Sequence, residues 1–128
     1  MKLQPDRFDT LSINAHGPGW IAVNGQKWTV STVVGSQGEL YGWECEQWAL
    51  LTPAHFDRLA ESRPELVIFG SGTRLRFVSP ALLRGLIERG IGIETMDTPA
   101  ACRTYNILAG EGRRVLAALL IETDQPPA

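Results

Sequence analysis

Two hydrophobic patterns divide this chain near residue 50. In the second half, short apolar runs alternate with segments of helical spacing, which predicts buried strands connected by helices. The expected strands are 66–69, 91–96 and 115–121. In the first half, apolar and polar residues alternate instead, and this is typical of antiparallel strands with one face in water.

Three hydroxyl–proline pairs predict where the helices of the second half begin. Each pair places a capping hydroxyl before a proline at the first helical position. The pairs are Thr52-Pro53, Ser79-Pro80 and Thr98-Pro99, and the expected helices are 53–61, 80–89 and 99–109. In the second helix the apolar residues recur at helical spacing, and they are Leu82, Leu83, Leu86 and Ile87.

The order of these elements predicts the topology of the second half. The first two strands and the helix between them form a right-handed βαβ unit from residue 66 to 96, with its strands parallel. A further helix and the strand at 115–121 complete the sheet. The direction of that last strand is left open by the sequence.

A two-residue turn at Asn24-Gly25 predicts a hairpin in the first half, because this dipeptide favours a type I′ turn. Pairing Val23 with Gln26 places Trp28 toward the core and Lys27 in solvent. The apolar face then comprises Ile21, Val23, Trp28 and Val30. A second reversal at 35–38 leads into 41–46, where apolar and polar residues again alternate, so an antiparallel meander is expected.

The length of 128 residues suits one domain. We expect residues 1–50 to be mostly antiparallel β, 51–121 to be α/β, and 122–128 to be a frayed tail. No apolar run approaches the ~20 residues of a membrane span, so membrane insertion is not expected. The N-terminus resembles no secretory signal, which favours a cytoplasmic location. Cys45 and Cys102 are expected to be free, buried thiols.

The charges are unevenly distributed. The net charge is −2 and the isoelectric point is about 5.6, which argues against nucleic-acid binding. Residues 70–114 nevertheless carry seven arginines against four acids. A small anion would suit that part of the chain.

The loop Gly70-Ser71-Gly72-Thr73 follows a predicted strand, and its glycines would let backbone N–H groups approach an anion. A dinucleotide-binding fingerprint is not formed, because Leu75 stands where the third glycine is needed. Ser71 also lacks the Gly-x-Ser-x-Gly setting of a hydrolase nucleophile. We predict no catalytic residue here.

The sequence gives little support for an imidazole base or for a metal site. The two histidines, His16 and His55, have no recognisable orienting carboxylate. Glu44 and Glu46 share one strand face, which indicates a solvated surface, and no Cys or His pair has metal-ligand spacing. Neither a metal nor a cofactor is predicted.

The third helix carries polar side chains more densely than an amphipathic helix requires. Thr98, Tyr105, Asn106 and Arg113 are hydrogen-bond donors, and a helix N-terminus adds partial positive charge. A structural interpretation is favoured slightly: Thr98 caps the helix, Tyr105 and Asn106 anchor neighbouring segments, and Arg113 pairs with Glu111 or Asp97. The candidate ligand- or partner-binding residues are Gly70, Ser71, Gly72, Thr73, Met96, Thr98, Tyr105, Asn106 and Arg113.

Several segments together resemble the complex I assembly factor 3 family, whose domain also occurs in adipogenesis-associated proteins and in bacterial and archaeal chains. They are 67–73, 90–94, 97–102, 104–106 and 111–113. The resemblance is specific over 66–121 and looser before it. It implies a three-layer α/β fold with a mixed central sheet and an additional antiparallel β layer. It also implies a non-catalytic role.

Two functional hypotheses follow. The first is a protein-interaction or assembly-factor-like module whose polar patch docks a partner protein or a small anion. The second is an enzyme acting on a small anionic substrate or nucleotide at Gly70–Thr73 and Thr98, with Asp97, Glu94 and Cys102 as titratable candidates. An enzyme should show a concave pocket containing a group with a perturbed pKa.

Overall fold

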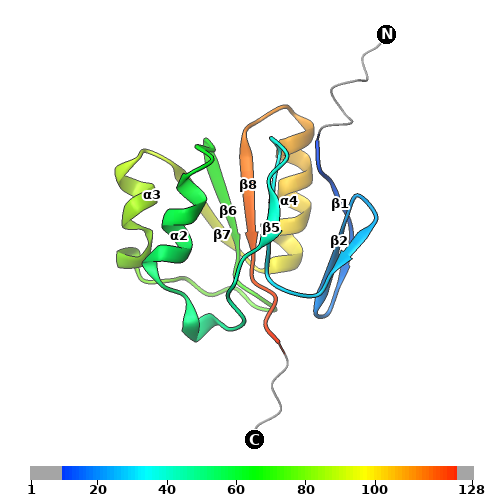
Figure 1. Ribbon diagram of the computed structural model, residues 1–128, viewed down its shortest axis with the longest axis horizontal. Coiled ribbons are helices and arrows are strands. Elements are labelled where there is room, and N and C mark those ends of the chain that lie inside the picture. The colour runs from blue at the N-terminus through cyan, green and yellow to red at the C-terminus, as the bar shows by residue number, and fades with distance from the viewer. Residues whose placement is uncertain (1–9, 124–128) are drawn as a thin grey trace, which may run out of the picture.

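A computed structural model describes residues 10–123, so 124–128 of the expected tail lie outside the described residues. A five-stranded sheet occupies the centre (Figure 1). Its strands, in spatial order, are β5 (Leu40–Gly42), β4 (Thr32–Gly35), β8 (Val115–Leu119), β6 (Leu66–Gly70) and β7 (Gly92–Met96). β6 runs parallel to both β7 and β8, whereas β4 is antiparallel to β8 and β5. The parallel βαβ unit over 66–96 is therefore confirmed, and β8 makes the sheet mixed.

Helices cover both faces of this sheet, with α2 and α3 on one side and α4 on the other (Figure 1). Their bounds are α2 Pro53–Ala60, α3 Arg84–Glu88 and α4 Thr98–Gly110, with 3₁₀ turns η1 at Trp48–Leu50 and η2 at Pro80–Leu83. The buried residues of α2 are Phe56, Leu59 and Ala60. The three helical segments predicted from the hydroxyl–proline pairs are all present.

The second helical segment departs from the regular helix expected over 80–89. Ser79 caps it as predicted, because the Ala81 N–H donates to Ser79 Oγ at 3.3 Å. The chain then forms the η2 turn before α3. Since a 3₁₀ turn has three residues rather than 3.6, the apolar face rotates. Leu86 is fully buried, but Ile87 is 58% exposed, so the four apolar residues do not all lie on the buried face.

The first half of the chain supplies strands to two sheets. β1 (Ile13–Gly17), β2 (Trp20–Val23) and β3 (Gln26–Trp28) form a separate antiparallel sheet, whereas β4 and β5 join the central one. The predicted hairpin register is confirmed by the pairing of Val23 with Gln26. Asn24 and Gly25 have φ of 46° and 87°, as a type I′ turn requires.

Buried and exposed side chains alternate along the hairpin as predicted, except at Val30, beyond the end of β3. Trp28 is half-buried against the core, and Lys27 is exposed. Val30, expected on the same apolar face, is 48% exposed. β3 ends at Trp28, so the strand alternation no longer governs Val30 and that expectation is wrong.

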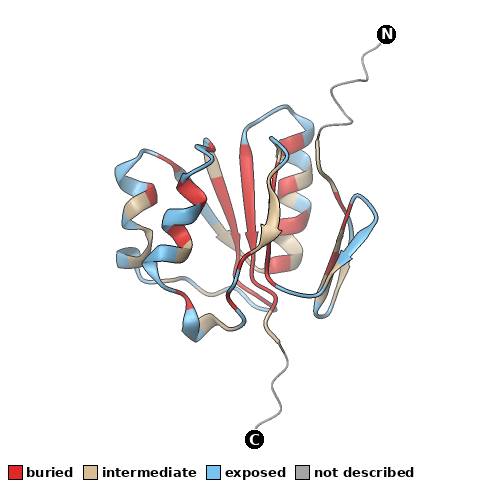
Figure 2. Cartoon of the chain, in the orientation of Figure 1, coloured by how far each residue is buried: buried red, intermediate tan, exposed pale blue. Residues whose placement is uncertain are grey.

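Two hydrophobic clusters lie on opposite faces of the central sheet, and β8 is buried along its whole length (Figure 2). Because side chains alternate along a strand, Leu116 and Ala118 pack toward α2, whereas Val115 and Ala117 pack toward α4. Both clusters therefore depend on the central position of β8.

Cys45 and Cys102 are free and buried, as expected. Burial raises the pKa of Cys102 to about 12. Its thiol is therefore protonated at neutral pH and is a poor nucleophile. Within residues 10–123, the helices are all too short or too polar to span a bilayer.

Candidate functional site

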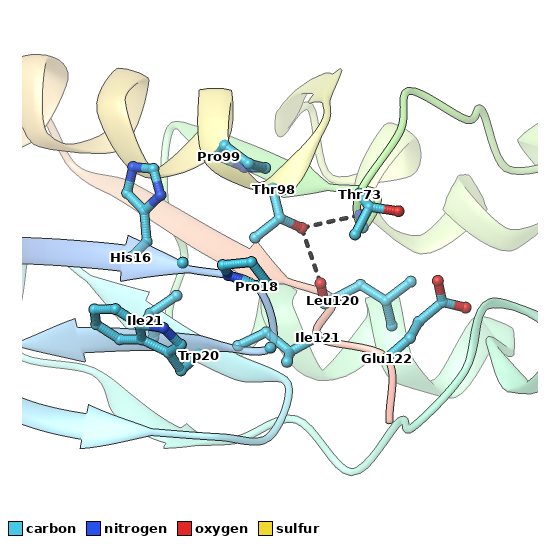
Figure 3. A pocket seen from close by; sticks show the side chains of 13 residues that line it. His16, Pro18, Trp20, Ile21, Thr73, Thr98, Pro99, Leu120, Ile121 and Glu122 are labelled. Carbon is cyan, nitrogen blue, oxygen red and sulfur yellow. Dashed lines mark hydrogen bonds between the residues drawn. The ribbon is translucent and has the colours of Figure 1, made fainter. Parts of the chain in front are cut away.

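Parallel strands β6 and β7 end at the same edge of the central sheet, and this places the 70–73 loop, which follows β6, beside the start of α4, which follows β7. The Gly72 N–H donates to Thr98 Oγ1 at 2.9 Å, and the Thr98 N–H donates to the Gly72 carbonyl at 2.8 Å. Thr98 Oγ1 also donates to the Leu120 carbonyl at 2.8 Å (Figure 3). The Thr98 hydroxyl thus joins three segments that are distant in sequence.

Gly70 permits this close approach. A Cβ atom at residue 70 would lie 2.9 Å from Thr98 Oγ1 and 3.0 Å from Thr98 Cα. Neither atom can move away without shifting the helix. Glycine at this position is therefore required by packing between β6 and α4.

Ser71 is buried and its polar atoms serve the loop. Its hydroxyl donates to the Arg74 carbonyl at 2.7 Å and accepts from the Arg76 N–H at 3.0 Å. Its own N–H donates to the Met96 carbonyl at 2.8 Å. Ser71 and Met96 therefore fix the loop against the end of β7, and the Ser71 hydroxyl is turned away from solvent.

The N-cap of α4 is Asp97 rather than Thr98, which corrects the cap expected from sequence. Asp97 Oδ1 accepts from the Ala100 N–H at 2.8 Å, and the Asp97 carbonyl accepts from the Ala101 N–H. Thr98 donates to Gly72, and Pro99 has no N–H. Every N–H of the first turn of α4 is thus accounted for, and a carboxylate already occupies the positive end of the helix.

The other three predicted residues lie toward the opposite end of α4 and contact different segments. Tyr105 Oη donates to the Leu11 carbonyl at 2.8 Å. Asn106 Oδ1 accepts from the Ile13 N–H, and its Nδ2 donates to the Ile13 carbonyl, each at 2.8 Å. These bonds tie α4 to the first strand of the small sheet and leave Tyr105 and Asn106 outside the neighbourhood of Gly72.

Arg113 follows the C-terminal end of α4 and pairs with Glu65, not with the Glu111 or Asp97 considered from sequence. Its Nε and Nη2 donate to Glu65 Oε1 at 3.2 and 3.1 Å. Both side chains are about two-fifths exposed. Arg113 is therefore part of a surface ion pair, apart from the loop at Gly72.

A pocket of about 270 Å³ lies between the turn that joins β1 to β2 (residues 16–21, called the hairpin turn below), the start of α4 and the segment after β8. Trp20 and Ile21 lie at one end, and Thr73 and Glu122 lie at the other (Figure 3). We call this the junction pocket. Its lining is mostly apolar, and it comprises His16, Gly17, Pro18, Gly19, Trp20, Ile21, Gly72, Thr73, Thr98, Pro99, Leu120, Ile121 and Glu122.

A second hollow adjoins the junction pocket. It shares Pro18, Gly19, Thr73 and Glu122 with it, and Thr29, Gln47 and Thr123 complete its lining. Its surface is more polar than that of the junction pocket. The two hollows together form a continuous depression with an apolar end and a polar end.

Sequence reasoning missed one wall of this depression. It located Gly72, Thr73 and Thr98, but it assigned no role to the hairpin turn at 16–21 or to Glu122. The turn Gly17-Pro18-Gly19 was a signal of a tight reversal. The residues of the turn and their neighbours in sequence do not indicate that the turn faces the ends of β6 and β8.

Four residues, which we call the arginine clamp, hold the 71–76 loop: Trp48, Ser71, Arg76 and Glu122. Arg76 Nη2 donates to the Ser71 carbonyl and to Glu122 Oε1, each at 2.6 Å. Its guanidinium lies over the Trp48 ring, 4.6 Å from the centroid. The Trp48 N–H donates to Glu122 Oε2 at 2.9 Å.

The clamp also sets the charge of Glu122. Burial raises the pKa of Glu122, but hydrogen bonds from the Trp48 amide and the Arg76 guanidinium outweigh it, so that this pKa lies below its ordinary value. Glu122 is therefore ionised at neutral pH. A general acid or base needs a pKa near the working pH, and the pKa of Glu122 is shifted in the opposite direction.

Metal binding has no obvious location in residues 10–123, where no three His, Cys, Asp or Glu side chains are grouped as ligands. The site can offer apolar surface, the imidazole of His16, the carboxylate of Glu122 and the hydroxyl of Thr73. These features suit binding of a mostly apolar group.

The matched region of the family comparison covers the central sheet and most of the segments that form the site. Residues 13–120 match the family described as "Protein of unknown function (DUF498/DUF598)". The chain belongs to this family.

Solved bacterial structures show the same architecture. A Bordetella parapertussis protein is 36% identical and superimposes with a TM-score of 0.83, covering 88% of this chain and 97% of that one. A Xanthomonas campestris protein is 34% identical with a TM-score of 0.78, covering 93% and 90%. The α/β fold with a mixed central sheet is thereby confirmed.

A relative with a named role is the bovine "NADH dehydrogenase [ubiquinone] 1 alpha subcomplex assembly factor 3", 45% identical over 62 residues. That match covers 48% of this chain and 34% of the bovine protein. The resemblance to the assembly factor family noted from sequence is confirmed. The chain matches only about a third of the length of this relative.

Proposed function

We propose that this protein is a non-catalytic protein-interaction module, and that the junction pocket receives an apolar side chain of its partner. The observation that carries the proposal is the pocket itself, which is concave, mostly apolar and built from three separate segments of the chain. A cavity of about 150 Å³ is enough to bind benzene. A pocket of about 270 Å³ therefore has room for a large aliphatic or aromatic side chain.

The polar chemistry around the pocket supports docking over catalysis. The Ser71 hydroxyl and the first-turn amides of α4 are engaged in structural bonds. The thiol of Cys102 is buried and protonated. An enzyme would need at least one titratable group held ready for proton transfer or attack, and the pKa of Glu122 moves away from neutrality.

The same chemistry argues against the small anion considered from sequence. An anion at the start of α4 would need free N–H donors, but these groups bind Gly72 and Asp97. It would also lie near the carboxylates of Asp97 and Glu122. Repulsion and the missing donors both oppose anion binding there.

The relatives support a role in protein assembly. The bovine relative is named an assembly factor of the NADH dehydrogenase [ubiquinone] 1 alpha subcomplex, and an assembly factor contacts other proteins. We propose that this chain also acts by contacting another protein. Because the match covers only a third of the bovine protein, the proposal does not extend to the partners of that protein.

Site-specific photo-crosslinking tests the proposal. Trp20, an aromatic wall of the junction pocket, is replaced by p-benzoylphenylalanine in the full chain, which is then irradiated in a native cell extract. We expect a discrete protein adduct. The matched control carries the same probe at Ile107, which is 61% exposed on α4, and should give none.

A second variant tests whether the adduct depends on the pocket. Thr73 is exposed at the rim shared by both hollows, so Thr73→Trp should obstruct the mouth without disturbing the core. Glu111→Trp, at the opposite end of α4, is its control. The proposal fails if the adduct forms equally with Thr73→Trp, or if positions 20 and 107 give the same products.

A further inference from the structure

The loop that leaves the junction pocket carries exposed apolar residues. Phe77 is 71% exposed, the highest fraction among the large hydrophobic side chains of the described residues, and Leu75 is 53% exposed. Arg74, beside them, is also exposed. We call Arg74, Leu75 and Phe77 the docking ridge.

The docking ridge has a fixed inner side. Arg76, between the two apolar residues, turns inward to the arginine clamp and contacts Ser71 and Glu122. The Arg74 carbonyl is held by the Ser71 hydroxyl. The loop is therefore anchored at alternate residues, and its outer side chains are presented to solvent from an ordered backbone.

An ordered backbone matters for the affinity of a docking surface. Flexible loops lose conformational freedom when they bind, and a loop that is already ordered avoids most of that cost. Aromatic and arginine side chains are also the residues that contribute most to binding energy at protein interfaces. The docking ridge combines both properties.

Charge indicates the kind of surface that fits. The arginines of the second half that form ion pairs are Arg76 and Arg113, as far as the described residues show. The guanidinium of Arg74 forms no hydrogen bond or close ion pair within that range, although its charge helps to lower the pKa of Glu122. A partner carrying carboxylates beside an apolar groove would complement both the charge and the apolar side chains.

We propose that the docking ridge inserts Leu75 and Phe77 into an apolar groove of a partner protein, where acidic residues border the groove and pair with Arg74. This inference rests on the proposed function only in requiring a protein partner. The ridge and the junction pocket share Thr73 as a neighbour, so one partner can contact both. An anionic membrane is the less suitable occupant, because two apolar side chains bury little surface in a bilayer.

The test places p-benzoylphenylalanine at Phe77 and irradiates the full chain in a native extract that includes the membrane fraction. The probe replaces one exposed aromatic side chain by another, so folding should be unaffected. We expect a protein adduct whose yield falls at least tenfold with Leu75→Ser. Arg74→Glu should reduce it at least as much, whereas Arg74→Lys should reduce it about twofold, since the charge is kept. Yield should also fall as salt rises from 50 to 500 mM.

Each alternative outcome overturns the inference. A protein adduct insensitive to Arg74→Glu and to salt would exclude the acidic groove. A lipid adduct in place of a protein one would assign the ridge to membranes. Products identical to those of the Ile107 probe would show that the ridge has no specific partner.

The two proposals fail separately. Loss of the Phe77 adduct with a retained Trp20 adduct would leave the pocket as the docking site and remove the ridge. The reverse result would retain the ridge and remove the pocket. Thermal unfolding of Leu75→Ser and Arg74→Glu serves as the folding control. Leu75→Ser should match the unmodified protein because the side chain is exposed, and Arg74→Glu should unfold only slightly lower, because it adds a like charge that Glu122 senses.

Discussion

The two ends of α4 carry similar polar residues but differ in what surrounds them. At the start, Thr98 bridges Gly72 and Leu120 and also lines an open pocket. Toward the far end, Tyr105 and Asn106 bind the backbone of Leu11 and Ile13, and neither residue lines the junction pocket or the adjoining hollow. Both sets satisfy polar groups of the backbone, but of these residues it is Thr98 that lines the junction pocket.

This difference teaches what a dense run of polar residues can indicate. Such residues are needed wherever a helix is joined to segments that are distant in sequence, because buried backbone groups require partners. A binding site needs, in addition, a space that the protein itself does not fill. That space is created here by the hairpin turn at 16–21, which belongs to the small sheet.

The largest effect should come from Thr98→Val, which keeps the shape of the side chain and removes its hydroxyl. The Gly72 N–H and the Leu120 carbonyl would both lose a partner at a buried position. We expect the free energy of unfolding to fall by about 3 kcal/mol, because each unsatisfied buried group costs roughly 1–3 kcal/mol. Urea denaturation measures this loss.

Thr98→Ser is the matched control, because it retains the hydroxyl and removes only a methyl group. It should keep most of the stability. Had Thr98 been only a helix cap, replacing it would cost about 1 kcal/mol. Equal stability of the Val and Ser variants would show that the hydroxyl bridge does not stabilise this end of α4.

Asn106→Leu tests the far end and should have the next largest effect. It removes two hydrogen bonds to Ile13, at a partly buried position where water can compensate in part. We expect a loss of about 2 kcal/mol. Ile107→Ala, at an exposed neighbour, is the control and should cost much less. Equal losses for the two variants would show that the bonds to Ile13 do not hold the small sheet against α4.

The arginine clamp should make a smaller contribution that depends on pH. Because the folded-state pKa of Glu122 lies below its ordinary value of 4.5, its stabilisation is fully present above that value and is lost as pH falls through the folded pKa. Glu122→Gln should therefore be less stable than the unmodified protein at pH 7 and equally stable near pH 2.

Unfolding free energies of both proteins from pH 7 to pH 2 measure this convergence. Glu111→Gln, which changes an exposed carboxylate at the other end of α4, should give a difference that is small at every pH. A gap between the Glu122→Gln and unmodified curves that persisted unchanged at pH 2 would show that the lost stability does not come from the ionised carboxylate.

Local signals predicted the elements of this fold well. Hydroxyl–proline pairs located the helix starts, and Asn24-Gly25 specified the hairpin register, because these signals act between neighbours in sequence. The prediction was poorer where a long-range contact decided the outcome. Residues 32–34 form a strand that pairs with β8, and the sequence between two turns does not reveal that partner.

For the same reason, the sequence predicted only one side of the site. Gly72 and Thr98 follow parallel strands, so the edge on which they meet could be inferred from topology. The packing of the small sheet against that edge depends on contacts such as those of Asn106 with Ile13, 93 residues apart. Pocket walls formed by Trp20 and Glu122 could therefore not be assigned from local pattern.

The smallest effect should come from Arg113→Ala, which distinguishes a surface ion pair from a site residue. Arg113 and Glu65 are both about two-fifths exposed at the surface, and such pairs contribute little because water screens them and two long side chains must be ordered. We expect the free energy of unfolding to be unchanged within experimental error. The Trp20 and Phe77 photo-adducts should form at the same yield as in the unmodified protein, because Arg113 follows the far end of α4. A loss of either adduct at unchanged stability would instead place Arg113 in the interface and extend it along the whole helix.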